Sequence, residues 1–391
     1  MRIFLAIPGS PNVAIESSLW RKNLHDPLVA MGHDVVLREE GILERFDLDP
    51  AAPATAPARA RFSEEFIAAV EAANRARPLD LVITYVHAAH LEPAAIERVR
   101  ERIAPILNFH CNDIHQFHLV RPIARHFTLC LVPEREAIAD YRRAGAEPFY
   151  WPMAANPAVY RPVPATPRYA ASFAGQRYGD RTALVLALRE AGVDTHLFGQ
   201  GWAWGPASDA SRTPAAERGA AGALAHLAGQ TLAGRLPWRA VADGFAWRAL
   251  AGRHAHALHG PLSDDAYVAL FSESYISLGF LIVGDSHRTL RPLRQVRLRE
   301  FEATMAGGFY LTGWIEELTD LYEIGKEIVC YRSRAELVDL ARWYLAHDTE
   351  RDRVRRAGRA RALRDHTWER RFEGLFAELA RRGILRATVS A

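Results

Sequence analysis

Short apolar runs alternate with helical patterns along the chain, and this alternation narrows the folds that it can adopt. Near the start, the apolar residues 3–7 precede a helical pattern over residues 19–31 and a second apolar run at residues 35–37. Further apolar runs, each followed by a helical stretch, occupy residues 81–86, 106–109 and 128–132. A strand, a helix and a strand in succession give parallel strands joined by crossovers. The sequence therefore predicts an α/β fold with helices on both faces of its sheets.

The length and the prolines predict two domains. A chain of 391 residues exceeds the size at which one hydrophobic core usually stops growing. Prolines recur every few residues between 151 and 164, which is typical of a stiff linker, and the alternation restarts after them. We expect doubly wound, Rossmann-like domains at residues 1–164 and 165–365, the second with a helical insertion at 203–258. The carboxyl ends of their parallel strands would face a central cleft, the default ligand site.

Charge and cysteine content exclude several classes of protein. The 49 basic residues are balanced by 46 acidic ones, so the chain lacks the single-sign field that attracts nucleic acid. Cys111, Cys130 and Cys330 show no CxxC spacing, which fits reduced thiols in a cytoplasm. No apolar stretch approaches the roughly 18 residues of a membrane-spanning helix. We expect a cytoplasmic protein; its oligomeric state is open.

The insertion carries apolar residues at helical spacing over residues 224–250, interleaved with Arg235, Arg239 and Arg248. Amphipathic helices of this kind usually pack on their own domain or on another subunit. The same pattern suits a helix that lies on a membrane surface. Both interpretations stay open, so a peripheral membrane contact is one expectation for this segment.

Polar residues that follow the predicted strands of the first domain are candidates for catalysis. They are Gly9, Ser10 and Asn12 after the first strand, His87 and His90 after the strand at 81–86, and His110 and Asp113 in the run 108–118. A histidine or carboxylate at a strand end can accept a proton from an attacking hydroxyl. Asp113 could instead cap the following helix. Because no second ligand pair has a diagnostic spacing, we expect no metal site.

The first strand of the second domain is followed by a candidate phosphate site. Gly175, Arg177 and Arg181 lie in the segment 173–181, which opens a helix. Glycines admit backbone N–H groups to an anion, the helix dipole favours negative charge, and arginines add forked cations. The segment matches neither the Walker A pattern nor GxGxxG.

These motifs resemble those of the CgeB-like glycosyltransferases (the spore maturation protein CgeB/YkvP type), a branch of the GT-B fold. The resemblance covers about residues 165–375 and rests on the segments 173–181, 198–202, 259–262, 299–303, 306–308, 311–312, 327–329 and 336–337, on Gly358 and on 366–368. It implies transfer of a sugar from a nucleotide diphosphate sugar, with the donor on the second domain and the acceptor on the first. Residues 366–391 would form a helix that crosses back to the first domain.

The resemblance also implies roles for single residues. Glu302 would accept hydrogen bonds from the donor ribose, while Arg299, Arg177 and Arg181 would neutralise the departing diphosphate. Fixed cations stabilise that leaving group most in the transition state, so neither a metal nor a cofactor is required. Further donor-side candidates are Gly175, Gly201, Trp202, His259, Gly307 and Gly308. The acceptor-side candidates are Gly9, Ser10, Asn12 and His90.

Two departures from the family pattern leave the mechanism open. Arg294 stands where related retaining enzymes carry a carboxylate, and Gly279 stands where the family often has Asn. Retention or inversion is therefore undecided, and the candidate bases are Asp113, His110 and His87, in that order. The acceptor could be a polysaccharide, a protein or a small molecule. The alternatives are a nucleotide-sugar epimerase or hydrolase of the same fold and a non-catalytic, coat-associated sugar-binding protein.

Overall fold

The chain folds into two compact units. The computed structural model describes residues 1–9, 11–12, 15–39, 49–203 and 234–385. One unit comprises Met1–Pro11, Ser17–Val159 and Arg364–Ala391, and the other comprises Asn12–Glu16 and Tyr160–Leu363. The first unit thus includes the C-terminal segment as well as the N-terminal one. The domain limits expected from the sequence, at residues 164 and 365, remain predictions, and the two units divide at Val159 and Leu363.

The first unit is built on a parallel six-stranded sheet of order β4-β1-β5-β6-β7-β8. Its strands are β1 (Arg2–Ala6), β4 (Asp34–Arg38), β5 (Leu81–Thr84), β6 (Ile106–Phe109), β7 (Leu129–Val132) and β8 (Pro148–Tyr150). The central strands β5, β6 and β7 are buried throughout and mostly apolar, because helices cover both of their faces; Thr84 and Asn108 are the polar exceptions. The strand order reverses direction between β1 and β5, where a doubly wound sheet opens a crevice.

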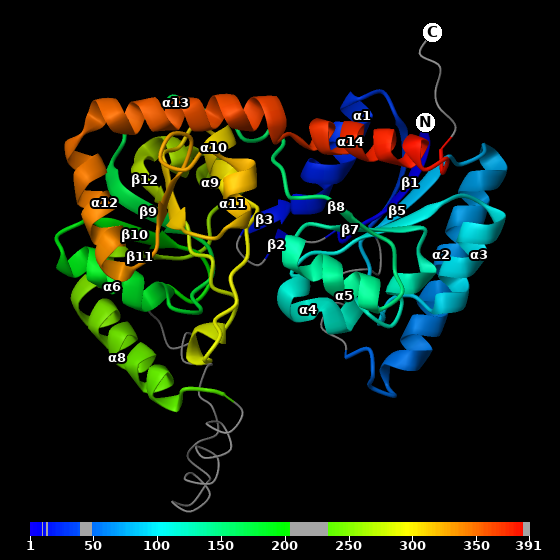
Figure 1. Ribbon diagram of the computed structural model, residues 1–391, viewed down its shortest axis with the longest axis horizontal. Coiled ribbons are helices and arrows are strands. Elements are labelled where there is room, and N and C mark those ends of the chain that lie inside the picture. Colours follow the sequence, from blue (N-terminus) through cyan, green and yellow to red (C-terminus); the bar gives the residue numbers. More distant parts are fainter. Residues whose placement is uncertain (10, 13–14, 40–48, 204–233, 386–391) are drawn as a thin grey trace, which may run out of the picture. The chain divides into compact units, whose positions relative to one another are not determined.

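Helices cover both faces of this sheet (Figure 1). They are α1 (Asp26–Ala30) after a π-helical turn at Arg21–His25, α2 (Thr55–Ala76), α3 (Pro93–Arg102), α4 (Asp113–Val120), α5 (Ile138–Arg143) and α14 (Trp368–Arg381). Phe62 and Phe66 of α2 pack on one face, in a core with Phe4 and Val82. On the other face α14 lies beside α1, and the ring of Trp368 meets that of Phe109.

Two segments rich in proline contain ordered structure. α2 begins at Thr55 although Pro57 follows two residues later, because the N–H groups of the first helical turn have no partner within the helix and the missing N–H of a proline costs nothing there. The proline-rich stretch 151–164, expected to be a linker, contains the division between the two units at Val159 and Tyr160, and its first residues pack in the first unit. Trp151 is buried, and its indole Nε1 donates to the carbonyl of Arg371 at the start of α14 (2.9 Å).

The second unit repeats the architecture with a parallel sheet of order β11-β10-β9-β12-β13-β14. Its strands are β9 (Tyr169–Ala174), β10 (Thr195–Phe198), β11 (Leu258–His259), β12 (Ser274–Leu278), β13 (Tyr310–Gly313) and β14 (Val329–Tyr331). The order reverses between β9 and β12. The α/β class with two such sheets, expected from the alternation, is confirmed. The short strands β2 (Pro11–Asn12) and β3 (Ile15–Ser18) pair with each other.

Helices again cover both faces (Figure 1). They are α6 (Arg181–Glu190), α8 (Pro237–His254), α9 (Asp264–Glu273), α10 (Arg299–Met305), α11 (Glu317–Leu321), α12 (Arg334–Ala346) and α13 (Asp348–Asp365). Val185, Leu250 and Leu337 bring α6, α8 and α12 into one core with Phe173. Short polar residues start several of these helices: Ser333 accepts from the backbone of Glu336 at α12. Within the described ranges, no helix combines the length and apolar character needed to cross a bilayer.

Candidate functional site

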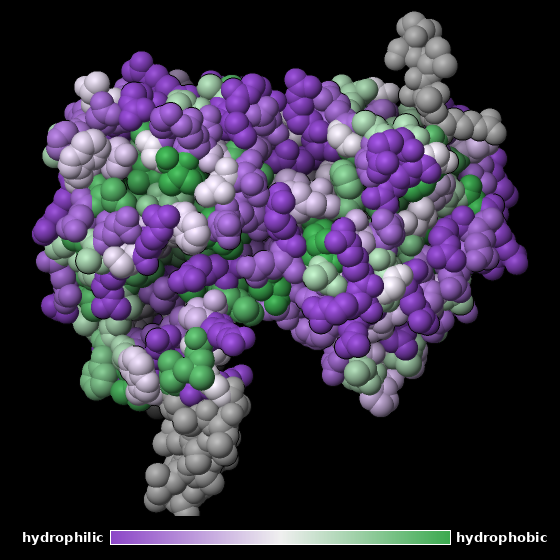
Figure 2. Space-filling view, in the orientation of Figure 1, coloured by the Kyte–Doolittle hydropathy of each residue, from purple (hydrophilic) through white to green (hydrophobic). Residues whose placement is uncertain are grey.

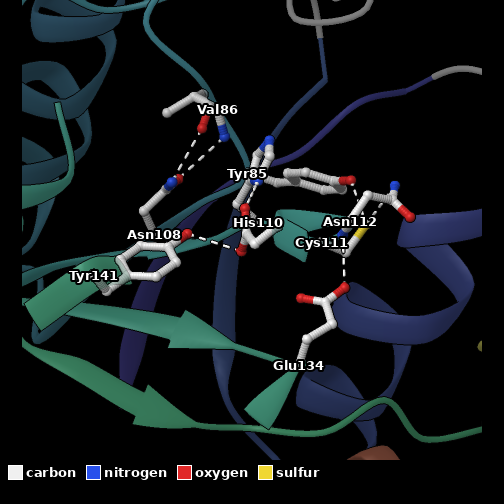
Figure 3. Close-up of polar contacts among 9 residues, drawn as sticks. Tyr85, Val86, Asn108, His110, Cys111, Asn112, Glu134 and Tyr141 are labelled. Carbon is white, nitrogen blue, oxygen red and sulfur yellow. Dashed lines mark hydrogen bonds and ion pairs between the residues drawn. The ribbon is translucent and has the colours of Figure 1, made fainter. Parts of the chain in front are cut away.

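In the first unit, a histidine and an aspartate meet just beyond β6 (Figure 3). The Nδ1 atom of His110 lies 2.5 Å from Oδ1 of Asp113, and both side chains are buried. The hydroxyl of Tyr141, from α5, donates to the other oxygen, Oδ2 (2.9 Å). Both oxygens of Asp113 are therefore engaged. A carboxylate against Nδ1 favours the tautomer with the proton on Nδ1, so the lone pair of His110 lies on Nε2.

The loop that carries this pair has an unusual backbone. Asn112 has φ +70°, in the left-handed region, which asparagine tolerates better than most residues. Its N–H donates to Oε1 of the buried Glu134, beyond β7 (2.7 Å), as Figure 3 shows. Asp113 is the first residue of α4 and not its cap, so the capping interpretation of Asp113 is wrong. Sequence reasoning overlooked Glu134, although its position directly after a buried strand was a usable signal.

The strand before this loop is tied to it by polar contacts. The amide of Asn108 in β6 bridges the backbone of Val86, donating to its carbonyl (3.0 Å) and accepting from its N–H (3.1 Å). The hydroxyl of Tyr85 lies 2.7 Å from the sulfur of Cys111 (Figure 3). Burial, with nearby Cys111, raises the pKa of Tyr85, so its phenol stays protonated. These contacts hold the ends of β5 and β6 in register.

His87 and His90 form a turn after β5. Both are fully buried. Nδ1 of His90 accepts from the N–H of His87 (3.1 Å), and Nδ1 of His87 accepts from the N–H of Ala89 (3.2 Å). Because these hydrogen bonds hold the turn together, they favour a structural role for His87 and His90 over proton transfer.

The three candidates after β1 are less informative. Gly9 lies against Glu39: a Cβ added at Gly9 would come within 2.6 Å of the Cβ of Glu39. Asn12 ends β2, and Ser10 lies outside the described residues.

In the second unit, three guanidinium groups gather at the carboxyl end of β9. Arg181 is buried, with its Cζ 3.6 Å from the ring centre of Tyr178 and 4.9 Å from that of Phe173. Arg299, at the start of α10, lies over the same Phe173 ring (4.7 Å). The Nε atoms of Arg181, Arg297 and Arg299 are buried and have no hydrogen-bond partner among the described residues. The fold thus concentrates three guanidinium groups beside aromatic rings and the acids Asp180, Glu300 and Glu302.

The titration behaviour of this cluster reflects the crowding of charge. Burial, with repulsion from Arg299 and Arg297, lowers the pKa of Arg181 to about 10. Burial would raise the pKa of the Tyr178 phenol, but the three guanidiniums outweigh it and the pKa lies below its ordinary value. Burial would lower the pKa of Arg299, yet neighbouring tyrosines and glutamates raise it overall. A bound polyanion would relieve the repulsion among these cations.

Two of the glycine candidates, Gly175 and Gly201, lie beside the arginine side chains of this unit. Gly175 has φ +155°, and a Cβ there would come within 2.8 Å of both Nη2 of Arg299 and the ring of Phe173. Its carbonyl accepts from Nε1 of Trp202, which is wholly buried in the core (2.6 Å). Trp202 therefore holds the Gly175 loop from the core side. This position favours a packing role for Trp202 over contact with the sugar donor. Gly201 accepts from Nε of Arg177 (2.8 Å), whose guanidinium lies over Trp247 (4.2 Å).

Glu302 lies inside α10 with both oxygens occupied. The hydroxyls of Tyr160 and Tyr267 each donate to one oxygen at 2.6 Å. Burial raises the pKa of Glu302, while the two tyrosine hydroxyls and Arg299 oppose the rise. Each carboxylate oxygen can accept a second hydrogen bond, so this arrangement orients Glu302 and leaves capacity for a ligand hydroxyl. The two tyrosines had no signal in the sequence, since they lie far from Glu302 along the chain.

A neighbouring buried carboxylate, Glu300, was also overlooked. It accepts from the N–H of Arg297 (2.7 Å) and from the hydroxyls of Tyr310 (3.2 Å) and Thr312 (3.1 Å). Burial raises its pKa, with Arg299 acting in the opposite direction. Glu300 thus ties the arginine-bearing end of α10 to β13.

Other donor-side candidates lie elsewhere in the unit. Gly307 and Gly308 connect the end of α10 to the start of β13, at the amino end of this strand and so opposite to the edge with Gly175. A turn is the role that this position favours. His259 ends the edge strand β11, where its ring stacks on Phe198 (4.5 Å) and its Nε2 lies 3.0 Å from Nδ1 of His196. Burial, with His196, lowers the pKa of His259.

A pocket of about 310 Å³ opens beside the cation cluster, at the carboxyl ends of β13 and β14. Asp180, Leu281, Arg294, Trp314, Arg332 and Arg334 contribute to its walls, whereas none of the predicted donor residues does. Within the described ranges, no three His, Cys, Asp or Glu side chains come together as metal ligands.

Comparison with known families identifies the class of protein. Residues 181–377, half of the chain, match the family described as glycosyl transferase-like. The chain belongs to this family, and the expectation of a glycosyltransferase is confirmed. Comparison with curated protein sequences gives no match.

Solved structures of other proteins show a similar fold. A glycosyltransferase from Rickettsia africae is 11% identical, with TM-score 0.60 and 99% of each chain covered. Sucrose-phosphate synthase from Thermosynechococcus elongatus is 14% identical, with TM-score 0.58, 97% of this chain covered and 99% of that one. Anabaena Alr3699/HepE, solved with UDP and glucose, is 11% identical, with TM-score 0.59 and the same coverage. The expected GT-B architecture is confirmed.

Proposed function

We propose that this protein transfers a glycosyl group from a nucleotide diphosphate sugar to an acceptor hydroxyl. The observation that carries the proposal is the cluster of Arg181, Arg297 and Arg299 at the carboxyl end of β9, beside Gly175, whose missing side chain leaves room for the Arg299 guanidinium. The similar fold of a protein solved with UDP and glucose favours UDP as the nucleotide. The segments 299–303 and 366–368 support a place in the CgeB-like branch.

In this proposal the two units divide the chemistry. Nε2 of His110 accepts the proton of the acceptor hydroxyl as the acceptor oxygen bonds to the anomeric carbon of the donor, while Asp113 stabilises the imidazolium. The bond from the anomeric carbon to the diphosphate breaks, and its electron pair leaves with the diphosphate. Arg181 and Arg299 stabilise the added negative charge, which is larger in the transition state than in the substrate. Glu302 accepts from the donor ribose.

Nucleotide binding tests the donor site. Calorimetric titration of the whole protein with UDP, GDP and dTDP should give binding, and Arg181→Gln and Arg299→Gln should each weaken it by about tenfold or more. Arg342→Gln is the matched control, since it removes an exposed arginine of the same unit whose guanidinium donates to the carbonyl of Ala191. Equal affinity in all three variants would place the nucleotide elsewhere.

Turnover separates the proposed transferase from its alternatives. With a nucleotide sugar and candidate acceptors, the enzyme should release nucleoside diphosphate only when an acceptor is present. Release without an acceptor, or conversion of the sugar, would indicate a hydrolase or an epimerase, and binding without turnover a non-catalytic protein. Transferase activity should persist in EDTA, because the arginines stabilise the leaving diphosphate in place of a metal ion. Loss of activity in EDTA, with recovery when a divalent ion is added, would contradict metal independence.

A further inference from the structure

Helix α8 presents an apolar face to solvent. Trp238, Val241 and Phe245 are 62%, 59% and 64% exposed, and their spacing of three and four residues places them on one side of the helix. Leu290, 71% exposed, joins them, because its N–H donates to the carbonyl of Gly234 just before the helix (3.0 Å). We call these four residues the α8 face. The opposite side of α8 is the packed one, where Leu250 is buried in the core.

This concentration is unusual for the molecule. Eight large apolar side chains are exposed in the described part of the chain, and half of them belong to the α8 face. Single exposed apolar residues are normal, whereas a group on one surface marks an interaction site. Figure 2 shows hydrophobic surface over the region where Figure 1 places α8.

Cations border the α8 face. The guanidinium of Arg239 lies 5.2 Å from the ring of Trp238, and that of Arg248 lies 6.0 Å from the ring of Phe245. Arg235 and Arg291 are exposed beside the two ends of the group.

The nearby acids do not balance these charges. Asp243 binds His287 (2.8 Å) and Arg288 (2.8 Å), and Asp285 binds Arg288 as well (2.9 Å). The surface around the α8 face is therefore apolar in the middle and basic at its rim.

We propose that the α8 face binds the surface of an anionic lipid bilayer. Exposed tryptophan and phenylalanine between arginines are suited to the boundary of headgroups and acyl chains, where the rings insert and the guanidiniums meet lipid phosphates. A second copy of the chain fits less well, since a symmetric contact would bring the same arginines together. Such docking needs no spanning helix. The inference stands on α8 and its rim and does not depend on the identity of the donor or acceptor.

Vesicle co-sedimentation of the whole protein tests this proposal. Vesicles of phosphatidylcholine mixed with phosphatidylglycerol should bind the protein, vesicles of phosphatidylcholine alone should bind it weakly, and added salt should reduce the binding. The double variant W238S/F245S should lower the partition coefficient by about tenfold or more. R235Q/R248Q should lower binding to the anionic vesicles alone. Trp343→Ser is the matched control, because Trp343 is exposed (42%) on α12 and should leave binding unchanged.

Three results would overturn the proposal. The protein could fail to bind the anionic vesicles, W238S/F245S could bind them as well as wild type does, or Trp343→Ser could lose as much vesicle binding as W238S/F245S. If the protein is a dimer in solution and W238S/F245S makes it monomeric without affecting vesicle binding, the α8 face joins two copies instead. Unchanged thermal unfolding and UDP affinity of W238S/F245S would show that the variant is folded.

Discussion

At the scale of the residue, the sequence named both His110 and Asp113 as candidate bases, and the contacts in the fold are the reason why we propose His110 ahead of Asp113. His110 and Asp113 follow a predicted strand, so both could be named in advance. Asp113 stood first among the bases, yet each of its oxygens is engaged, by His110 and by Tyr141. Tyr141 lies 28 residues further along the chain, and no local pattern links it to Asp113. The proposal of His110 as the base therefore rests on contacts that only the tertiary fold supplies.

Replacing His110 should therefore affect chemistry more than binding. His110→Gln removes the proposed base, and we expect kcat to fall by about 10²-fold or more while the affinity for UDP stays within about twofold. Asp113→Asn keeps one oxygen that can accept from His110, but its NH2 group cannot accept from Tyr141 and it loses the charge that stabilises the imidazolium, so kcat should fall and its pH profile should shift. Steady-state kinetics with UDP titrations measure both effects. A His110→Gln enzyme with wild-type kcat would exclude His110 as the base.

Glu302 leads to a prediction about pH. Burial raises its pKa above that of an unfolded carboxyl, so folding stability decreases as pH rises from the unfolded towards the folded pKa. Tyr267→Phe removes a hydroxyl that opposes this rise. The free energy of unfolding of this variant should then fall more steeply than that of wild type between about pH 5 and pH 8. Urea titrations across this range measure the slope.

Tyr331→Phe is the control for that experiment. Tyr331 is also a buried tyrosine, but its hydroxyl donates to the carbonyl of Gly279, which does not titrate (3.0 Å). Tyr331→Phe should lower the free energy of unfolding by about 1 kcal/mol at every pH. Parallel pH profiles for Tyr267→Phe and wild type would mean that the hydroxyl does not influence the charge on Glu302.

At the scale of the element, apolar runs predicted the central strands well, because a parallel strand buried on both faces is apolar over most of its length. The burial of segments rich in proline was not predicted. Composition indicated a linker at 151–164, where the two units divide, but it did not show that Trp151 is buried against α14, more than 200 residues away in sequence. Proline restricts the backbone locally and says nothing about burial.

The loop after β9 can be tested with a single methyl group. Gly175→Ala would place a Cβ 2.8 Å from the Arg299 guanidinium and from the Phe173 ring, and its φ of +155° disfavours any side chain. We expect UDP affinity to drop about tenfold or more because Arg299 must move, with stability lower by about 1–3 kcal/mol.

Gly192→Ala separates that displacement from backbone strain. Gly192 has φ +83° after α6, but open space surrounds its Cβ position. It should lower stability by about 1 kcal/mol and leave UDP affinity unchanged. Calorimetric titration and chemical denaturation of both variants measure the difference. An equal effect on affinity in both would attribute the Gly175 result to strain and not to Arg299.

At the scale of the whole molecule, the first unit is assembled from both ends of the chain. Nε1 of Trp368 donates to Oδ1 of Asn23 (2.9 Å), and the Trp368 ring packs on Trp151 (5.2 Å between ring centres). Thr367 caps α14 by accepting from the N–H of Arg370. The motif at 366–368 therefore secures the C-terminal helix to the N-terminal sheet. The resemblance suggested such a crossing, but Asn23 as its polar anchor could not be predicted from a pattern.

Trp368→Ala should consequently weaken the first unit alone. Removal of the fully buried indole leaves a cavity and takes away the donor to Oδ1 of Asn23, at a cost of about 3–5 kcal/mol. Hydrogen exchange followed by mass spectrometry should show loss of protection in β1, β5 and α14, while β9, β12 and the UDP affinity of the second unit persist. Glu373→Ala, an exposed change on the same helix, should leave both patterns intact. If protection fell equally in both units, they would unfold as one cooperative body and nucleotide binding would be lost together with the first sheet.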